Sequence, residues 1–172
     1  SYESYKLKAD AMSEEIASAN YQQEPIDLKG RLYSVFKEYD DIPRDDKGQS
    51  LLQGIYAYVD TADTGNDYLA GGVFGKHGSY AYMLDVIYTK ESMEITEPET
   101  AKMLKDNEVN LARIESNNGG RAFARNVRRI LEDEFHSYRT DVTWFTQSKN
   151  KAARILSNSA WIMEHVLWPH GW

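Results

Sequence analysis

The order of strand-like and helix-like segments most restricts the fold of this chain. Five short runs are rich in β-branched and aromatic residues, which favours strands. These runs are residues 55–60, 68–74, 80–88, 109–115 and 141–145. Short turns join the first three, which predicts antiparallel strands. Helical patterns follow the third, fourth and fifth runs, so the predicted order is β-β-β-α-β-α-β-α.

Local signals place the starts of the predicted helices. Thr96-Glu-Pro-Glu99 has the form of a capping box with proline in the first helical turn, which predicts a helix to about Asn107. Gly119-Gly120 is expected to open a second helix, and Ser148 to cap the last one. Asp85, inside the third strand, is expected to face solvent.

Three antiparallel strands followed by β-α-β-α units are typical of the ribonuclease H-like fold. In that fold the first and fourth strands are adjacent and parallel. We therefore expect an α/β protein with a mixed five-stranded sheet flanked by helices. The right-handed crossover rule is compatible with this layout but does not by itself select it.

The first 50 residues differ from the rest of the chain. A short helical pattern ends at Pro25, because proline removes a backbone donor and disfavours helix before it. Residues 38–48 are acidic and rich in turn formers, which is typical of a linker or an exposed loop. We expect an N-terminal helix and linker over residues 1–50 and a separate domain over 51–172.

Composition excludes several classes of protein. The chain has no cysteine, which excludes disulfides and thiolate metal sites and favours an intracellular protein. No apolar run is long enough to span a bilayer, and residues 1–20 do not resemble a signal peptide. The net charge of −7 argues against a wholesale nucleic-acid binder, although a local basic face can still bind phosphate.

Two carboxylates lie at the ends of predicted strands. If the strands of Asp60 and Glu115 are adjacent and parallel, both side chains emerge at one edge of the sheet and can share a divalent metal. For Asp60 alone, an Asx turn that caps the next loop is the more common role. A glutamate that ends an apolar strand is less common, because burying an unpaired carboxylate is costly. Asp63, in the loop after Asp60, is a further candidate ligand.

Basic residues form two candidate DNA-binding clusters. Arg121 and Arg125 lie on the polar face of the second predicted helix. A second cluster, at the start of the last helix, comprises Lys149, Asn150, Lys151 and Arg154. Cations at a helix N-terminus oppose the helix dipole, which suggests an anionic partner. A solvated polar face explains the arginine pattern about equally well.

Four motifs resemble the large terminase subunit of tailed bacteriophages. Residues 21–25 with 30–33 resemble the connection that follows its ATPase domain. Val59–Tyr68 resembles the first-strand motif of its nuclease domain. Ile114–Gly120 resembles its Glu-x-Asn-x-x-Gly motif, and Asn150–Ile155 its Asn-Lys-x-x-Arg-Ile motif. The resemblance covers nearly the whole chain.

This resemblance implies an endonuclease that cuts concatemeric viral double-stranded DNA with two Mg²⁺ or Mn²⁺ ions. Asp60 and Glu115 match the family's metal ligands. A third acidic ligand is expected in an Asp-rich motif beyond Trp172, so the chain is expected to be truncated. The implied partners are the ATPase domain, the small terminase subunit and the portal protein, in the cytoplasm of a bacterial host.

Two alternatives remain at this point. An actin-like or sugar-kinase-like nucleotide-binding domain shares the three-strand start and a strand-end aspartate, and ATP binding would distinguish it. A DNA-docking or portal-docking module with an incomplete site is the other alternative, and it would bind no Mn²⁺.

Overall fold

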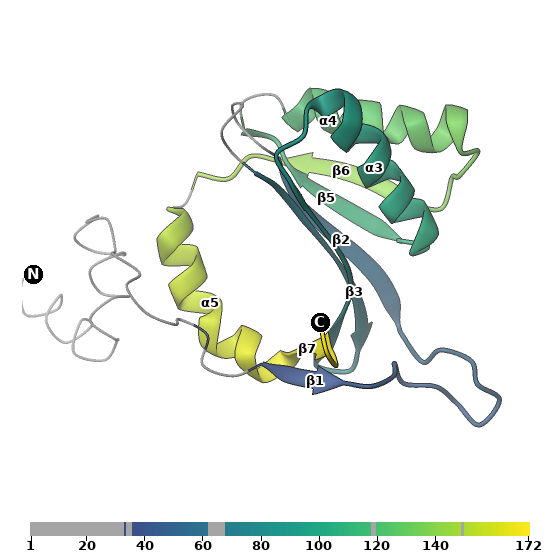
Figure 1. Cartoon of the computed structure of the whole chain (residues 1–172), viewed down its shortest axis with the longest axis vertical. Coiled ribbons are helices and arrows are strands. Elements are labelled where there is room, and N and C mark those ends of the chain that lie inside the picture. The colour runs from purple at the N-terminus through teal and green to yellow at the C-terminus, as the bar shows by residue number, and fades with distance from the viewer. Residues whose placement is uncertain (1–32, 34–35, 62–67, 118–119, 149) are drawn as a thin grey trace, which may run out of the picture. The chain divides into compact units, whose positions relative to one another are not determined.

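The computed structural model describes residues 33, 36–61, 68–117, 120–148 and 150–172 (Figure 1). The chain divides into two compact units, which we describe separately. One unit comprises residues 38–147 and 167–172, and the other comprises residues 1–37 and 148–166. The predicted boundary at residue 51 stays a prediction.

A seven-stranded sheet forms the larger unit, in the order β1-β7-β4-β3-β2-β5-β6. The strands are β1 (Lys37–Tyr39), β2 (Gly54–Asp60), β3 (Leu69–His77), β4 (Tyr80–Thr89), β5 (Leu111–Glu115), β6 (Asp141–Phe145) and β7 (Val166–Pro169). β2 to β6 are the five predicted strands, and β1 and β7 extend the sheet beyond β4.

The pairing of the strands agrees with the predicted topology. β2, β3 and β4 are antiparallel neighbours, whereas β2 pairs with β5 and β5 with β6 in parallel. The first and fourth predicted strands are therefore adjacent and parallel. This arrangement brings the carboxyl ends of β2, β5 and β6 to one edge of the sheet.

Two helices cover one face of the sheet. α3 (Met93–Asp106) and α4 (Gly120–Arg129), which continues into the π-helix η3 (Ile130–Glu134), lie on the same side of the central strands (Figure 1). The buried residues of β2, β5 and β6 on this side alternate along each strand. They are Ala57, Val59, Ala112, Ile114 and Val142, and they pack with Phe123, Ala124 and Val127 of α4. The opposite residues of the same strands form the second face.

Two local predictions were wrong. α3 begins at Met93, with Ser92 at its N-cap, so Thr96 and Pro98 lie inside the helix and the capping box does not form. Thr96 is buried within α3, and this burial outweighs its capping tendency. Asp85 was predicted to face solvent, but it is half-buried and accepts a hydrogen bond of 2.7 Å from the Asn107 amide.

The main described element of the smaller unit is one helix. α5 (Lys151–His165) has Asn150 at its N-cap, and the Asn150 side chain accepts a hydrogen bond from the Ala153 N–H. The expectation that Ser148 caps this helix was therefore wrong, because Asn150 is the residue that satisfies a free donor of the first turn. Among the residues that the structure describes, no helix is long and apolar enough to cross a bilayer.

Candidate metal site at the carboxyl edge of the sheet

Asp60 and Glu115 are direct neighbours in the sheet. They are register partners at the ends of the parallel strands β2 and β5. Neighbouring strands are about 4.8 Å apart, and in-register residues of a parallel pair point to the same face. The structure therefore brings the two predicted carboxylates together on the face that α3 and α4 do not cover.

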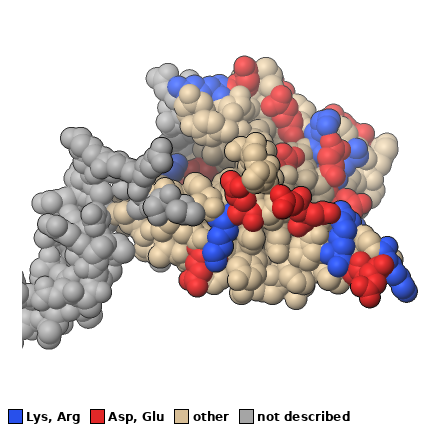
Figure 2. Space-filling view, turned by 60° about the horizontal axis from the view of Figure 1, so that its bottom comes forward, with Lys and Arg blue, Asp and Glu red and all other residues tan. Residues whose placement is uncertain are grey.

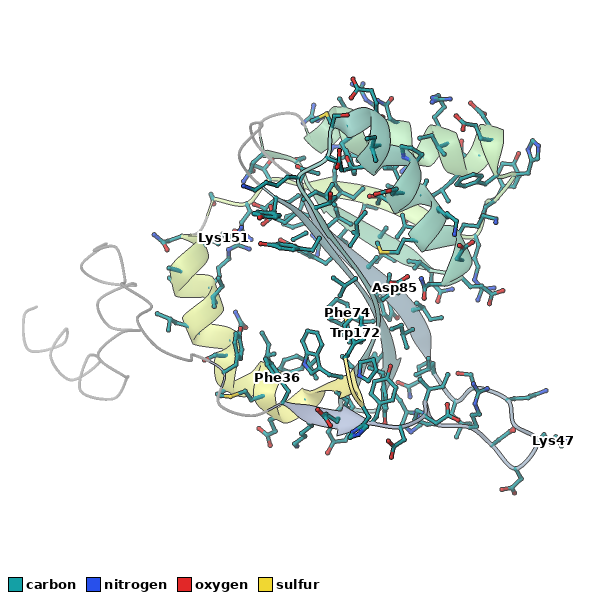
Figure 3. The ribbon with its side chains drawn as sticks, in the orientation of Figure 1. Phe36, Lys47, Phe74, Asp85, Lys151 and Trp172 are labelled. Atoms are coloured by element: carbon teal, nitrogen blue, oxygen red, sulfur yellow. The ribbon has the colours of Figure 1, made fainter. Side chains whose placement is uncertain are left out.

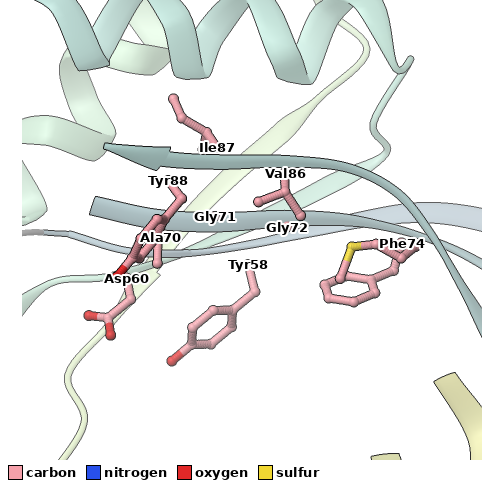
Figure 4. A pocket seen from close by; sticks show the side chains of 10 residues that line it. Tyr58, Asp60, Ala70, Gly71, Gly72, Phe74, Val86, Ile87 and Tyr88 are labelled. Atoms are coloured by element: carbon pink, nitrogen blue, oxygen red, sulfur yellow. The ribbon is translucent and has the colours of Figure 1, made fainter. Parts of the chain in front are cut away.

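The residues around this pair form two rows across the uncovered face. The row at the carboxyl edge reads, from β4 to β6, Tyr88, Ala70, Asp60, Glu115 and Phe145. The row behind it reads Val86, Gly72, Tyr58, Arg113 and Thr143. Figure 4 shows Tyr58, Asp60 and Phe74 pointing to one side of the sheet, while Ile87 points to the other, toward a helix.

Two neutral side chains donate hydrogen bonds to Glu115. The Tyr58 hydroxyl donates to Glu115 Oε2 at 2.7 Å, and the Asn117 amide donates to Oε1 at 2.9 Å. Within the described part of the chain, Glu115 is the only charged side chain that is buried, with 6% of its surface exposed. Neutral donors of this kind orient a buried carboxylate and add no positive charge that would compete with a cation.

The segment after β5 explains why this motif contains asparagine and glycine. Asn117 also binds the backbone of Gln147, donating to its carbonyl at 3.0 Å and accepting from its N–H at 3.1 Å. At Gly120 a Cβ atom would overlap the Glu115 carbonyl oxygen and would lie 2.9 Å from Thr61 Oγ1. The Thr61 hydroxyl donates to the same carbonyl at 3.1 Å. Only glycine lets the start of α4 approach the end of β5 this closely.

A shallow apolar groove lies beside Asp60, on the side away from Glu115. Its volume is about 380 Å³, and small residues of β3 form its floor where larger side chains would fill it (Figure 4). Gly72 and Ala70 lie at the floor, and Tyr58, Val86 and Tyr88 line the sides. The groove gives a ligand room to reach Asp60 along the face of the sheet.

Other predicted site residues have different positions. Asp63 and Lys149 lie outside the described residues. Arg121 and Arg125 are exposed on α4, in the helical layer. Lys151 lies at the start of α5 (Figure 3), and Arg154 follows one turn later, in the smaller unit. Asn150 caps that helix, and a DNA-binding role for this cluster stays a prediction.

The residues present fit a divalent cation of the Mg²⁺ or Mn²⁺ type. Carboxylate oxygens are the ligands that these hard cations prefer, and two of them are in register here. In the part of the chain that the structure describes, no group of three Asp, Glu, His or Cys side chains could hold a metal. Among the described residues, the candidate site consists of the two carboxylates and their hydrogen-bonding neighbours.

Figure 2 shows Asp and Glu side chains interspersed with Lys and Arg on the face that it displays. This mixture agrees with the net charge of −7. On this face, contacts to a polyanion would depend on individual basic residues rather than on a large basic field.

Sequence reasoning missed several residues that lie around the two carboxylates. Tyr58 and Arg113 each lie two residues before a carboxylate, and the two-residue period of a strand places both on the same face as the site. Asn117 stood inside a recognised motif without an assigned role, and Gly120 was predicted to open a helix but not to approach the Glu115 carbonyl. Thr61 gave no signal, because its contact is to a backbone carbonyl 54 residues away.

The strand order and the paired carboxylates define a class of protein, the α/β domains with a ribonuclease H-like fold. A comparison with protein families then gives the particular family. The chain belongs to the family described as "Terminase Bacteriophage T7, Ribonuclease H-like domain", which matches residues 59–166, more than half of the chain. No curated protein sequence matches it.

Solved structures of large terminases are similar to this chain. The large terminase of a thermophilic bacteriophage is 11% identical over 81% of this chain and 33% of that chain, with a TM-score of 0.50. The nuclease domain from bacteriophage SPP1, with bound Mn, is 15% identical over 80% and 72% of the two chains, with a TM-score of 0.48. The nuclease domain from bacterial virus Sf6 is 14% identical over 59% and 41%, with a TM-score of 0.45. The chain thus spans less than half of the Sf6 domain.

Proposed function

We propose that this chain is the metal-dependent endonuclease domain of a phage DNA-packaging terminase. The observation that carries this proposal is the in-register pair of Asp60 and Glu115 at the carboxyl edge of a ribonuclease H-like sheet. Membership of the terminase family directs the proposed activity to phosphodiester hydrolysis in double-stranded viral DNA. The actin-like alternative is not favoured, because the family match covers both carboxylates and the last helix.

Each side chain at the edge has a proposed role. Asp60 and Glu115 hold two Mg²⁺ or Mn²⁺ ions, with Asp63 as a further proposed ligand. In such sites divalent ions activate water and stabilise the leaving oxygen of the phosphodiester. Tyr58 and Asn117 fix the two oxygens of Glu115, so that its orientation is set before a metal binds. The groove beside Asp60 gives the substrate access to the site.

We propose that basic residues away from the edge contact the DNA backbone. Arg121 and Arg125 on α4 form one such set. Lys149, Asn150, Lys151 and Arg154 around the start of α5 form the other. Contacts to phosphate orient the duplex without reading its sequence. The proposed partners are the ATPase domain, the small terminase subunit and the portal protein, in the host cytoplasm.

Replacement of Asp60 with asparagine tests the proposed function. Asp60→Asn keeps the size of the side chain and removes its charge, so Mn²⁺-dependent cutting of plasmid DNA should be lost while circular dichroism and thermal unfolding stay the same. Asp141→Asn is the matched control, because Asp141 starts β6 at the opposite edge of the sheet. Full cleavage by Asp60→Asn would exclude the assignment.

A metal titration separates a nuclease from a docking module. Calorimetry of the wild-type chain with Mn²⁺ should show binding that Glu115→Gln abolishes, because the amide cannot supply the charge that a cation requires. If the wild-type chain binds no Mn²⁺ but still binds DNA, the docking alternative is the better description. Binding of ATP would instead support the nucleotide-binding alternative.

A further inference from the structure

Arg113 occupies a position that neither the family match nor the sequence motifs assign. It lies on β5 two residues before Glu115, so its side chain emerges on the same uncovered face of the sheet. Its register partners are Tyr58 on β2 and Thr143 on β6. Arg113 is exposed, whereas Glu115 is buried. A permanent positive charge therefore lies one row behind the carboxylate pair.

An aromatic ring supports the guanidinium of Arg113. Its central carbon lies 4.5 Å from the centre of the Phe145 ring, and Phe145 is the register partner of Glu115. The Tyr58 ring also lies beside the Phe145 ring, with 5.7 Å between the ring centres. A guanidinium stacked over a ring face keeps the N–H groups at its edge directed outward. The stacking also restricts the side chain, which lowers the entropy lost when it binds a ligand.

The charge pattern of this face indicates what Arg113 binds. Two carboxylates on neighbouring strands repel a polyanion, even where they hold the metal that the polyanion needs. A fixed cation within two residues of them gives the approaching phosphate a favourable contact. The planar fork of an arginine suits two oxygens of one phosphate, which is a geometry that lysine does not offer.

We propose that Arg113 binds a backbone phosphate of the nucleic acid next to the metal site and positions the strand for cleavage. This inference rests on the proposed function, since it takes the substrate to be DNA. The proposed Arg113 contact is separate from those proposed for α4 and α5, because Arg113 lies on the same face of the sheet as the two carboxylates. Phe145 is the positioning residue that holds the guanidinium.

The salt dependence of DNA binding tests the contact directly. Binding of a short fluorescent duplex is measured by anisotropy in EDTA, which keeps the DNA intact, over a range of salt concentrations. Loss of one phosphate contact lowers the slope of log K against log salt by about 0.9. Arg113→Gln should show this decrease. Arg129→Gln is the matched control, because Arg129 is an exposed arginine on α4 that pairs with Glu134, and its slope should equal that of the wild type.

Cleavage kinetics separate positioning from a structural role. Arg113→Gln should raise KM for plasmid DNA roughly tenfold, because a charged hydrogen-bonding group is lost, while Mn²⁺ affinity is unchanged. Arg113→Lys should recover part of the salt slope that Arg113→Gln loses, because lysine carries the same positive charge. Its KM should stay closer to that of Arg113→Gln than to that of the wild type, because lysine lacks the planar guanidinium. Phe145→Leu should also raise KM, by a smaller factor, because the guanidinium loses its support.

The outcomes separate this inference from the proposed function. Equal salt slopes for wild type and Arg113→Gln, or an equal decrease in Arg129→Gln, would overturn the role of Arg113 even if Asp60→Asn abolishes cleavage. A lower slope confined to Arg113→Gln, together with full cleavage by Asp60→Asn, would support the phosphate contact and reject Asp60 as a metal ligand required for cleavage.

Discussion

The two faces of the central strands differ in what their residues do, although they alternate along the same segments. Val59 and Ile114 are fully buried beneath the helices, and the residues that follow them, Asp60 and Glu115, point to the opposite face. Core residues and candidate ligands are thus consecutive in sequence but lie on opposite faces of the sheet. We therefore expect substitutions on the helix-covered face to change stability and substitutions on the opposite face to change metal binding. A residue that contacts both faces should affect both quantities.

The largest expected effect is on the helix-covered face. Ile114→Ala removes a fully buried side chain beside Glu115 and should lower the free energy of unfolding by about 3.5 kcal/mol, as urea denaturation would measure. The Mn²⁺ affinity of the folded protein should stay the same. Ile95→Ala is the control, because Ile95 is 42% exposed on α3, and it should change stability by less than about 0.5 kcal/mol. Loss of metal binding in folded Ile114→Ala would show that the two faces are coupled.

Gly120 is the residue at which the two faces meet. Gly120→Ala forces the start of α4 away from the Glu115 carbonyl, so it should cost about 3 kcal/mol of stability and also weaken Mn²⁺ binding. Ala122→Ser adds one heavy atom on the exposed side of the same turn and should do neither. Paired urea denaturation and calorimetry measure both effects. Normal metal affinity in a destabilised Gly120→Ala would mean that Glu115 does not depend on this contact.

Much of the fold followed from the sequence because strand alternation and turn residues are local signals. The five central strands and the helix that opens at Gly120 were predicted within a few residues. β1 and β7 were not, because strands of three and four residues carry too short a pattern. The start of α3 was also missed, since burial of Thr96 outweighs the capping box.

The site was only partly predictable for the same physical reason. Asp60 and Glu115 could be found because they end apolar runs. Their register, and the contact of Tyr58 with Glu115, depend on pairing between strands more than 50 residues apart. Asn117 lies two residues after Glu115, but its position is also set by its contacts with Gln147, 30 residues further along the chain. A single sequence gives no local pattern for such pairing. The contact of Arg113 with the Phe145 ring depends on a second long-range pairing, that of β5 with β6.

Replacement of Asn117 tests whether metal binding by Glu115 depends on the segment that follows β5. Asn117→Ala removes the donor to Glu115 Oε1 and both contacts to Gln147, so Mn²⁺ affinity should fall roughly thirtyfold, or about 2 kcal/mol. Asn126→Ala is the control, because its amide binds Glu97 on the helical layer. If both variants bind Mn²⁺ like the wild type, orientation of Glu115 by Asn117 is unimportant for the metal.

The smallest expected effect comes from a single hydroxyl group. Tyr58→Phe removes only the donor to Glu115 Oε2 and keeps the ring that packs on Phe145, so Mn²⁺ affinity should fall about tenfold, or about 1.4 kcal/mol. Tyr56→Phe is closely matched, since Tyr56 lies two residues earlier on the same face of β2 and is 39% exposed. Calorimetry should separate the two variants while urea denaturation does not. Equal loss of affinity in both would mean that the uncovered face responds to any lost hydroxyl, and that Tyr58 has no specific role in holding Glu115.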